Sequence, residues 1–215
     1  MTKPRMYLWL VLVSSLWVST AVAQIAPGAP QGGDEALLQS YDFESAGKLK
    51  EALSALESMP PSRSNSYLGW ARRGWLQYRL GQHNESLESY RKAIALAPHA
   101  IEPRLGILLP QLALHRFTDA EVVAKEVLRY DPQSYLATLR LAFVYYNQHR
   151  YGDSVSLYQH LRDLYPSDTD VRSGLAWGLL KAGRTQDAAK EFRDLLAINP
   201  RLTTARDGLQ LSGIH

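Results

Sequence analysis

The sequence has no cysteine among its 215 residues. This absence excludes disulfides, thiol nucleophiles, zinc–thiolate sites and a lipidated N-terminal cysteine, so packing alone must hold the fold together. The excess of positive over negative charge is also small. The chain has 24 Lys and Arg and 21 Asp and Glu, which gives a formal charge of +3, and it has no block of like charges. We therefore expect no nucleic-acid partner.

Motifs of the common enzyme classes are also missing. The chain contains no G-x-x-x-x-G-K-[ST] loop, no G-x-G-x-x-G turn and no G-x-S-x-G elbow, which excludes the usual phosphate, dinucleotide and hydrolase signatures. None of its six histidines forms a His-x-x-x-His pair or stands beside a carboxylate cluster. We therefore expect no metal site and no cofactor, and interpret the chain as a non-enzyme.

The one long apolar run lies at the N-terminus. Lys3 and Arg5 precede an apolar stretch over residues 6–18, and Ala21-Val22-Ala23 follows. This pattern predicts a signal peptide over residues 1–23, cleaved between Ala23 and Gln24, and hence a periplasmic or secreted protein with no membrane span after cleavage. The alternative is an uncleaved anchor, since residues 6–23 come close to the ~20 apolar residues of a span. Residues 24–33, QIAPGAPQGG, predict a flexible leader.

The rest of the chain is periodic. Pro98, Pro132, Pro166 and Pro200 recur at one constant interval, which defines a 34-residue period. A column of small residues keeps the same phase: Ala52, Ser86, Ala120, Ser154 and Ala188. Three columns of mostly bulky residues do so too: Leu56, Tyr90, Ala124, Tyr158 and Phe192; Met59, Ala93, Val127, Leu161 and Leu195; and Leu96, Tyr130, Leu164 and Ile198. A fixed period of this size indicates a solenoid of repeated units.

Each column has a mechanical interpretation. The small column lets two antiparallel helices approach, and the bulky columns fill the space between neighbouring helices. Gly47, Gly81 and Gly183 share a column with His115 and His149, where we expect a left-handed residue to end the first helix of each pair. The prolines end the second helix, because the residue before a proline avoids the α region.

The columns resemble a known repeat family. Residues 70–98 carry Trp70, Gly74, Gly81, Tyr90, Ala93 and Pro98, in a spacing similar to the tetratricopeptide repeat (TPR) consensus, and the resemblance extends over residues 34–202. It implies an all-α fold, a right-handed α-solenoid of about five helix pairs with a C-terminal capping helix. Two places depart from the pattern. Pro60-Pro61 cuts the second helix of the first unit, and Pro110 predicts a kink or an early end of a helix.

The period divides the chain into a degenerate first repeat at 34–66, then repeats at 67–100, 101–134, 135–168 and 169–202, and a cap at 203–215. We expect first helices near 34–46, 67–80, 101–114, 135–148 and 169–182. Second helices should lie near 48–59, 84–97, 118–131, 152–165 and 186–199, and a last helix near 203–211.

A further column of large apolar residues, here named the stripe, lies on the first helices: Tyr41, Trp75, Leu109, Phe143 and Trp177. In TPR proteins this position usually faces the concave groove, so the resemblance implies an apolar groove. We predict that a partner binds along Tyr41, Trp75, Tyr78, Arg79, Leu109, Phe143, Tyr146, Asn147, Trp177 and Lys181, with Arg72 and Arg140 on a cationic rim. The alternative is that the stripe is core, because apolar residues at helical spacing usually pack inside.

Aromatic and arginine side chains dominate binding hot spots. The groove therefore predicts a non-catalytic scaffold of an envelope or secreted complex, which binds a peptide with apolar anchors and possible acidic flanks. The resemblance argues against the clamp that grips acidic chaperone tails, since Trp75, Leu109 and Phe143 replace its asparagines. Two alternatives stay open: self-assembly into a homo-oligomer through the ends of the array, and binding of a small molecule or glycan on Trp75, Tyr78 and Trp177.

Overall fold

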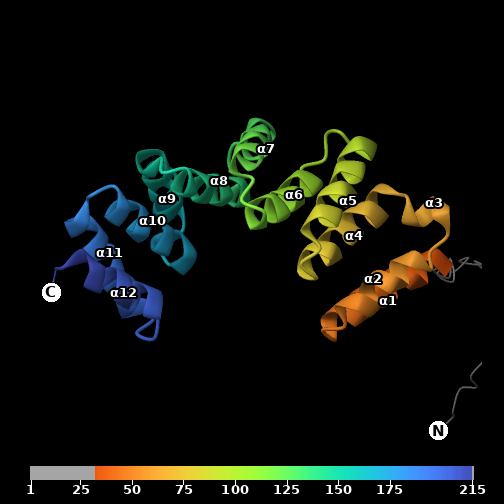
Figure 1. The fold of residues 1–215 in the computed structure, drawn as a ribbon, viewed down its shortest axis with the longest axis horizontal. Helices are drawn as coiled ribbons and strands as arrows, with labels where there is room; N and C mark the ends of the chain where they lie inside the picture. The colour runs from red at the N-terminus through yellow and green to blue at the C-terminus, as the bar shows by residue number, and fades with distance from the viewer. Residues whose placement is uncertain (1–31, 215) are drawn as a thin grey trace, which may run out of the picture.

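A computed structural model describes residues 32–214. Within this range the chain forms twelve helices and no strand, which confirms the all-α repeat fold. The helix pairs follow one another along an open arch, with α6 on its inner side and α7 on its outer side (Figure 1). The predicted signal peptide, and the leader up to residue 31, lie outside the described residues.

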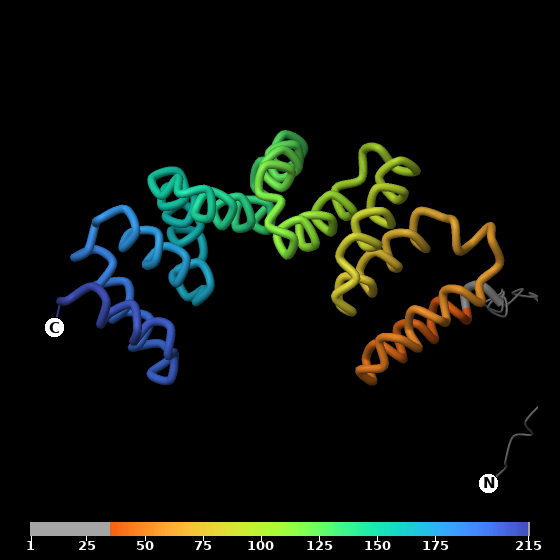
Figure 2. Tube along the Cα trace, viewed as in Figure 1, coloured from red at the N-terminus to blue at the C-terminus, as the bar shows by residue number. Residues whose placement is uncertain are grey.

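The chain passes through the pairs in order, from the N-terminal pair to the last helix (Figure 2). The first helices of the five pairs are α1 Gly32–Ser45, α4 Tyr67–Arg79, α6 Glu102–Ala113, α8 Tyr135–Asn147 and α10 Thr169–Lys181. The second helices are α2 Leu49–Glu57, α5 His83–Leu96, α7 Phe117–Tyr130, α9 Tyr151–Leu164 and α11 Thr185–Ile198. The final helix is α12 Thr203–Ser212. These bounds lie within two residues of the expected ones. A short helix, α3 Pro61–Ser64, was not expected; it begins at Pro61, a residue type favoured in the first turn of a helix.

The turn inside each pair has the predicted left-handed residue. Gly47, Gly81 and Gly183 have φ between 74° and 77°, and His115 and His149 have φ of 55° and 60°. The two histidine rings pack edge-on against Phe117 and Tyr151, neighbours two residues further along. The histidines are therefore turn residues, as the column indicated.

The small column forms the centre of each helix pair. All five of its members are fully buried, and the two serines also join the helices of a pair. Ser86 Oγ donates to the Gly74 carbonyl oxygen over 2.7 Å, and Ser154 Oγ donates to that of Ala142 over 2.8 Å. The small side chains therefore allow close packing and, where hydroxylated, a hydrogen bond across the contact.

One bulky column does not belong to the core. Leu96, Tyr130, Leu164 and Ile198 are 50–58% exposed, so the expectation that they fill the space between helices is wrong. The reason is rotational. Ten residues separate each of them from the small column, which turns the side chain about 80° away from the buried face at 100° per residue.

Pro110 does not end its helix. α6 continues to Ala113, and the Leu114 N–H still donates to the Pro110 carbonyl oxygen over 3.0 Å. The expected early end is wrong because the buried packing around Pro110 holds the last turn, although the proline lacks an N–H for the helix. The kink stays a prediction. Ile107, Leu108 and Pro110 are all buried.

Over the first four junctions, consecutive repeats meet through contacts that alternate in size; the fifth junction repeats the type of the fourth. Tyr90 packs on Gly106, Tyr158 on Gly174, and Phe192 on Gly208, so closely that a Cβ on any of these glycines would lie under 3.0 Å from the ring. At the other two junctions, Leu56 and Ala124 stand at the position of the ring, and Arg72 and Arg140 stand at the position of the glycine. Large side chains thus meet glycine, and smaller ones are paired with arginine. The contact pattern has a period of two repeats over residues 67–202.

Candidate functional site

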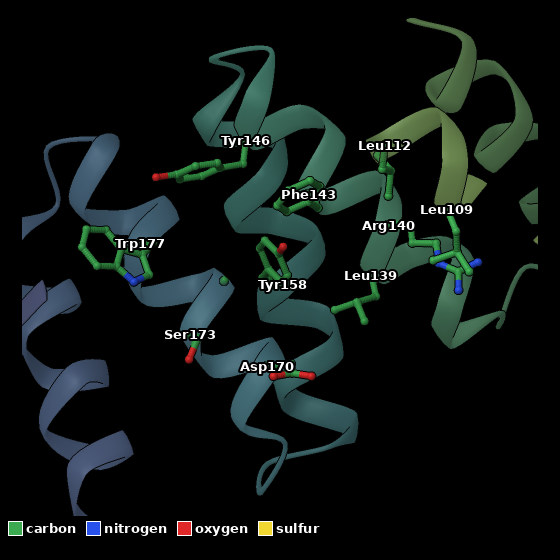
Figure 3. Close-up of a pocket in the computed structure, with 11 residues that line it drawn as sticks. Leu109, Leu112, Leu139, Arg140, Phe143, Tyr146, Tyr158, Asp170, Ser173 and Trp177 are labelled. Atoms are coloured by element: carbon green, nitrogen blue, oxygen red, sulfur yellow. The ribbon is translucent and has the colours of Figure 1, made fainter. Parts of the chain in front are cut away.

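A pocket of about 650 Å³ opens between α6, α8 and α10 and is called the C-terminal pocket here (Figure 3). Its lining is mostly apolar and comes from three consecutive repeats: Leu109, Leu112, Leu139, Arg140, Phe143, Tyr146, Tyr158, Asp170, Ser173, Gly174 and Trp177. Because the first helices supply nearly all of these residues, the pocket depends on the stacking of the repeats. It contains one cation, Arg140, and one carboxylate, Asp170.

The stripe divides between two pockets. Leu109, Phe143 and Trp177 line the C-terminal pocket. Tyr41 and Trp75 line a smaller one of about 260 Å³, the N-terminal pocket, together with Tyr67, Leu68, Ala71, Arg72, Tyr90, Glu102 and Pro103.

No member of the stripe is part of the buried core. Phe143 is 44% exposed and Tyr41 46%, and the other three members are half-buried. The side chain of Trp177 is held by edge-on packing against Phe192, with ring centroids 5.3 Å apart. The stripe is therefore a partly exposed surface with fixed aromatic side chains.

The other predicted site residues are placed unevenly. Tyr146 and Arg140 line the C-terminal pocket, and Arg72 lines the N-terminal one. Four others line neither pocket: Tyr78, Arg79, Asn147 and Lys181. The Asn147 amide donates to the Phe143 carbonyl oxygen over 2.8 Å, so this side chain is engaged with its own helix.

A polar network occupies the N-terminal half of the groove. Glu44 accepts hydrogen bonds from Arg72 Nη1, from Trp75 Nε1 over 2.6 Å and from Arg79 Nη1 over 3.1 Å. Arg72 also donates to Ser40 Oγ and to the Ser40 carbonyl oxygen. Arg72 is only 6% exposed, so its interpretation as a rim cation is wrong: its guanidinium joins α1 to α4 inside the structure.

The carboxylate of Glu44 is held ionised by this network. Burial alone would raise its pKa, but hydrogen bonds from Trp75 and Arg72, together with the charges of Arg72 and Arg79, bring the pKa below its usual value. The indole of Trp75 is fixed by the same carboxylate. This half of the groove therefore satisfies its own charges.

The two pockets are copies of each other, offset along the chain by two of the 34-residue periods. Six lining positions correspond: Tyr41 with Leu109, Ala71 with Leu139, Arg72 with Arg140, Trp75 with Phe143, Tyr90 with Tyr158, and Glu102 with Asp170. Arginine, an aromatic residue, a tyrosine from a second helix and a carboxylate recur in both. The site is therefore a duplicated unit rather than one continuous groove.

The sequence interpretation missed several lining residues, among them Leu139, Tyr158, Asp170 and Ser173. Tyr158 was assigned only to the column between helices, although its ring also reaches the pocket. It also missed a sixth member of the stripe: Leu211 in α12 follows Trp177 by one period and is 69% exposed. The constant spacing of the stripe was the signal that could have found it.

The chemistry of the C-terminal pocket is suited to binding. Burial lowers the pKa of the Arg140 guanidinium, since a low dielectric disfavours the charged form, yet arginine stays protonated at neutral pH. Burial also raises the pKa of the Tyr158 phenol, which is therefore a neutral hydrogen-bonding group.

Over residues 32–214 no three His, Asp or Glu side chains are placed to hold a metal ion. In the same range no helix has the length and apolar character that crossing a membrane requires.

Sequence comparison supports the repeat assignment. Two profiles described as tetratricopeptide repeat match the chain, one over residues 67–100 and the other over residues 111–178. Among curated proteins, no relative matches the sequence.

Several solved structures share the fold. A tetratricopeptide repeat protein from Parabacteroides merdae has a TM-score of 0.74 and 21% identity, over 84% of this chain and 72% of its own. The TPR protein TTC0263 of Thermus thermophilus has a TM-score of 0.65 and 18% identity, over 85% of this chain and all of its own. YrrB, described as a TPR protein with an unusual peptide-binding site, has a TM-score of 0.68 and 11% identity, over 81% of this chain and 90% of its own. At these identities, the likeness establishes the fold alone.

Proposed function

Because the chain contains tetratricopeptide repeats, which generally form non-catalytic scaffolds that bind protein partners, we propose that it is a scaffold whose C-terminal pocket binds a peptide segment of a partner protein. The supporting observation is the pocket itself. Its volume of about 650 Å³ is in the range of roughly 300–1,000 Å³ that is typical of ligand sites. Its apolar lining includes Phe143, which is 44% exposed.

The pocket is also arranged before any partner arrives. Trp177 is packed against the fully buried Phe192, and Tyr158 is wedged against Gly174. Rigid aromatic side chains lose little conformational freedom on binding, so more of the contact energy becomes affinity. This supports a site for peptide side chains that insert between α8 and α10.

The scaffold would work outside the cytoplasm, in an envelope or secreted complex. This part of the proposal is supported by the predicted signal peptide over residues 1–23, with its basic start, apolar run and Ala21-Val22-Ala23 site.

The test is selection of random dodecapeptides displayed on phage, with the full chain immobilised. We expect the wild-type chain to enrich peptides and the double variant Phe143→Ala and Trp177→Ala to enrich none of them. The matched control is Leu164→Ala, which also removes an exposed apolar side chain (58%) but lies outside both pockets. Helicity by circular dichroism should be the same in all three proteins. Equal enrichment by the double variant would refute the proposed site.

Self-assembly is a second candidate function, favoured by the exposed Leu211 at the C-terminal end of the array. α12 packs against α11 as a first helix would, with Gly208 under the Phe192 ring. Light scattering of the full chain over a hundredfold concentration range separates the two functions. A mass that does not change with concentration would exclude assembly through this end.

A further inference from the structure

The two pockets differ in one chemical respect: the charged residues that line the N-terminal one have partners within the chain. Arg72 is paired with the Glu44 carboxylate. Glu102 accepts a hydrogen bond from the Tyr67 hydroxyl over 2.8 Å, and the pKa of Tyr67 is raised to about 12 by burial and by this contact. Both charges that line the pocket therefore have partners within the chain.

In the C-terminal pocket these internal partners are replaced. Leu112 stands at the position equivalent to Glu44, two periods further along the chain. The Tyr135 hydroxyl, equivalent to that of Tyr67, donates to Asp168 instead of Asp170. Arg140 donates only to the Leu105 carbonyl oxygen, and no carboxylate of residues 32–214 pairs with it. The pocket therefore keeps the two charges of its N-terminal copy without the ion pair and the tyrosine hydrogen bond that those charges have there.

An unpaired guanidinium in an apolar pocket is costly, and a carboxylate placed against it recovers that cost. In the N-terminal pocket, Glu44 provides this carboxylate. From the same position in the C-terminal pocket, Leu112 offers only apolar surface. The Arg140 guanidinium, which bonds only to the Leu105 carbonyl oxygen, can therefore pair with a carboxylate that comes from outside the chain.

We propose that the occupant of the C-terminal pocket is an apolar peptide segment that carries one Asp or Glu side chain, which pairs with Arg140 as Glu44 pairs with Arg72. This inference rests on the proposed function. Asp170 fixes where the acidic residue docks, because the two carboxylates repel each other. In Figure 3, Leu139 lies between Arg140 and Asp170, so the two charged groups mark different parts of the lining. The apolar residues of the segment pack on Phe143 and Trp177.

The experiment uses the peptides selected on the full chain. The most enriched peptide is synthesised in two forms, with its acidic residue as Glu and as Gln, and each is titrated by the change in fluorescence polarisation. We expect the Glu form to bind the wild-type chain at least about tenfold more tightly than the Gln form, as charge-assisted hydrogen bonds allow. High salt should reduce this preference.

The decisive variant is Leu112→Glu, which supplies an internal carboxylate as in the N-terminal pocket. We expect it to bind the Glu and Gln forms equally, while the matched control Leu112→Gln keeps the preference. Arg140→Gln should also abolish the preference, and it provides the same test without a change at Leu112. A preference for Glu that survives both Leu112→Glu and Arg140→Gln would overturn the proposal.

The selection itself separates the two levels of inference. If the enriched peptides bind through Phe143 and Trp177 but carry no excess of Asp or Glu, the carboxylate proposal is wrong and the peptide-binding function stands. If the wild-type chain enriches no peptide, the proposed function is wrong, and the carboxylate proposal with it.

Discussion

Substitution of Gly174 tests the contact that builds the C-terminal pocket. Alanine at a helical glycine normally stabilises a protein by about 1 kcal/mol, through helix propensity. At Gly174, however, the new Cβ would lie under 3.0 Å from the Tyr158 ring, and this ring is only 4% exposed. Overpacking of a filled core costs about 1–3 kcal/mol. The new Cβ would come as close as 2.3 Å to the ring, which places the cost in the upper part of this range. Gly174→Ala should therefore destabilise by about 1–2 kcal/mol once the propensity gain is subtracted.

A double-mutant cycle isolates the cause of this loss. Tyr158→Ala removes the ring and should itself cost about 3–5 kcal/mol. In that background the overlap is gone, so Gly174→Ala should now stabilise by about 1 kcal/mol. The effect of Gly174→Ala on stability therefore changes sign when Tyr158 is replaced by alanine. Urea unfolding followed by circular dichroism measures each variant through its midpoint and slope.

The matched control is Gly152→Ala. Gly152 also lies in a helix, α9, but beyond its chain neighbours and the backbone of its own helix no atom comes within 4 Å of the position that a Cβ would take. This substitution should be neutral or stabilising in both backgrounds. If Gly174→Ala raised the urea midpoint of the wild-type chain as Gly152→Ala does, the contact between Tyr158 and Gly174 would not exist and the stacking that positions the pocket would be wrong.

Two further predictions concern pH and processing. The Lys125 hydrogen bond, with help from Arg150 and against burial, lowers the pKa of Glu121 from 4.5 to about 2. A carboxyl group with a lower pKa in the folded state contributes stability above its unfolded pKa, and this contribution is lost as the pH falls from about 4.5 toward 2. Glu121→Gln should therefore lose less in melting temperature between pH 6 and pH 3 than the wild type, and an equal loss would contradict the pairing. Expression in a secreting bacterium should yield a chain that starts at Gln24, whereas an intact N-terminus in mass spectrometry would argue for the uncleaved anchor.

The helices were predictable because each boundary has a local cause. Glycine or histidine in the turn, and proline after the second helix, act within a few residues, and they recur with the 34-residue period. The exposure of Leu96 was also contained in the sequence, through its rotation relative to Ser86. An apolar column at a fixed phase does not by itself imply burial, because rotation about the helix axis decides which face a side chain occupies.

The site was predictable only in part. The stripe is visible in the sequence because its members share one position in each repeat. The burial of Arg72 was not visible, because Arg72 is 28 residues from Glu44 and the contact exists only once α1 and α4 are stacked. The division into two pockets was not visible in the sequence either. Tyr158 reaches the lining from the second helix of its repeat, where it packs on Gly174 of the next repeat. Such contacts depend on how neighbouring repeats pack against each other. The residue types at one position of the repeat do not specify this packing.

The alternation of large and small residues at the junctions has a consequence for the ancestry of the array. Removal of residues 101–134 would bring Tyr90 against Arg140, a ring against a bulky side chain, whereas removal of residues 101–168 would bring Tyr90 against Gly174 and reproduce a junction that already exists. At these junctions, loss of a pair of repeats therefore leaves the neighbours compatible, while loss of a single repeat does not. Over residues 67–174 the unit on which gene duplication could act without repair is two repeats long, which is also the offset between the two pockets.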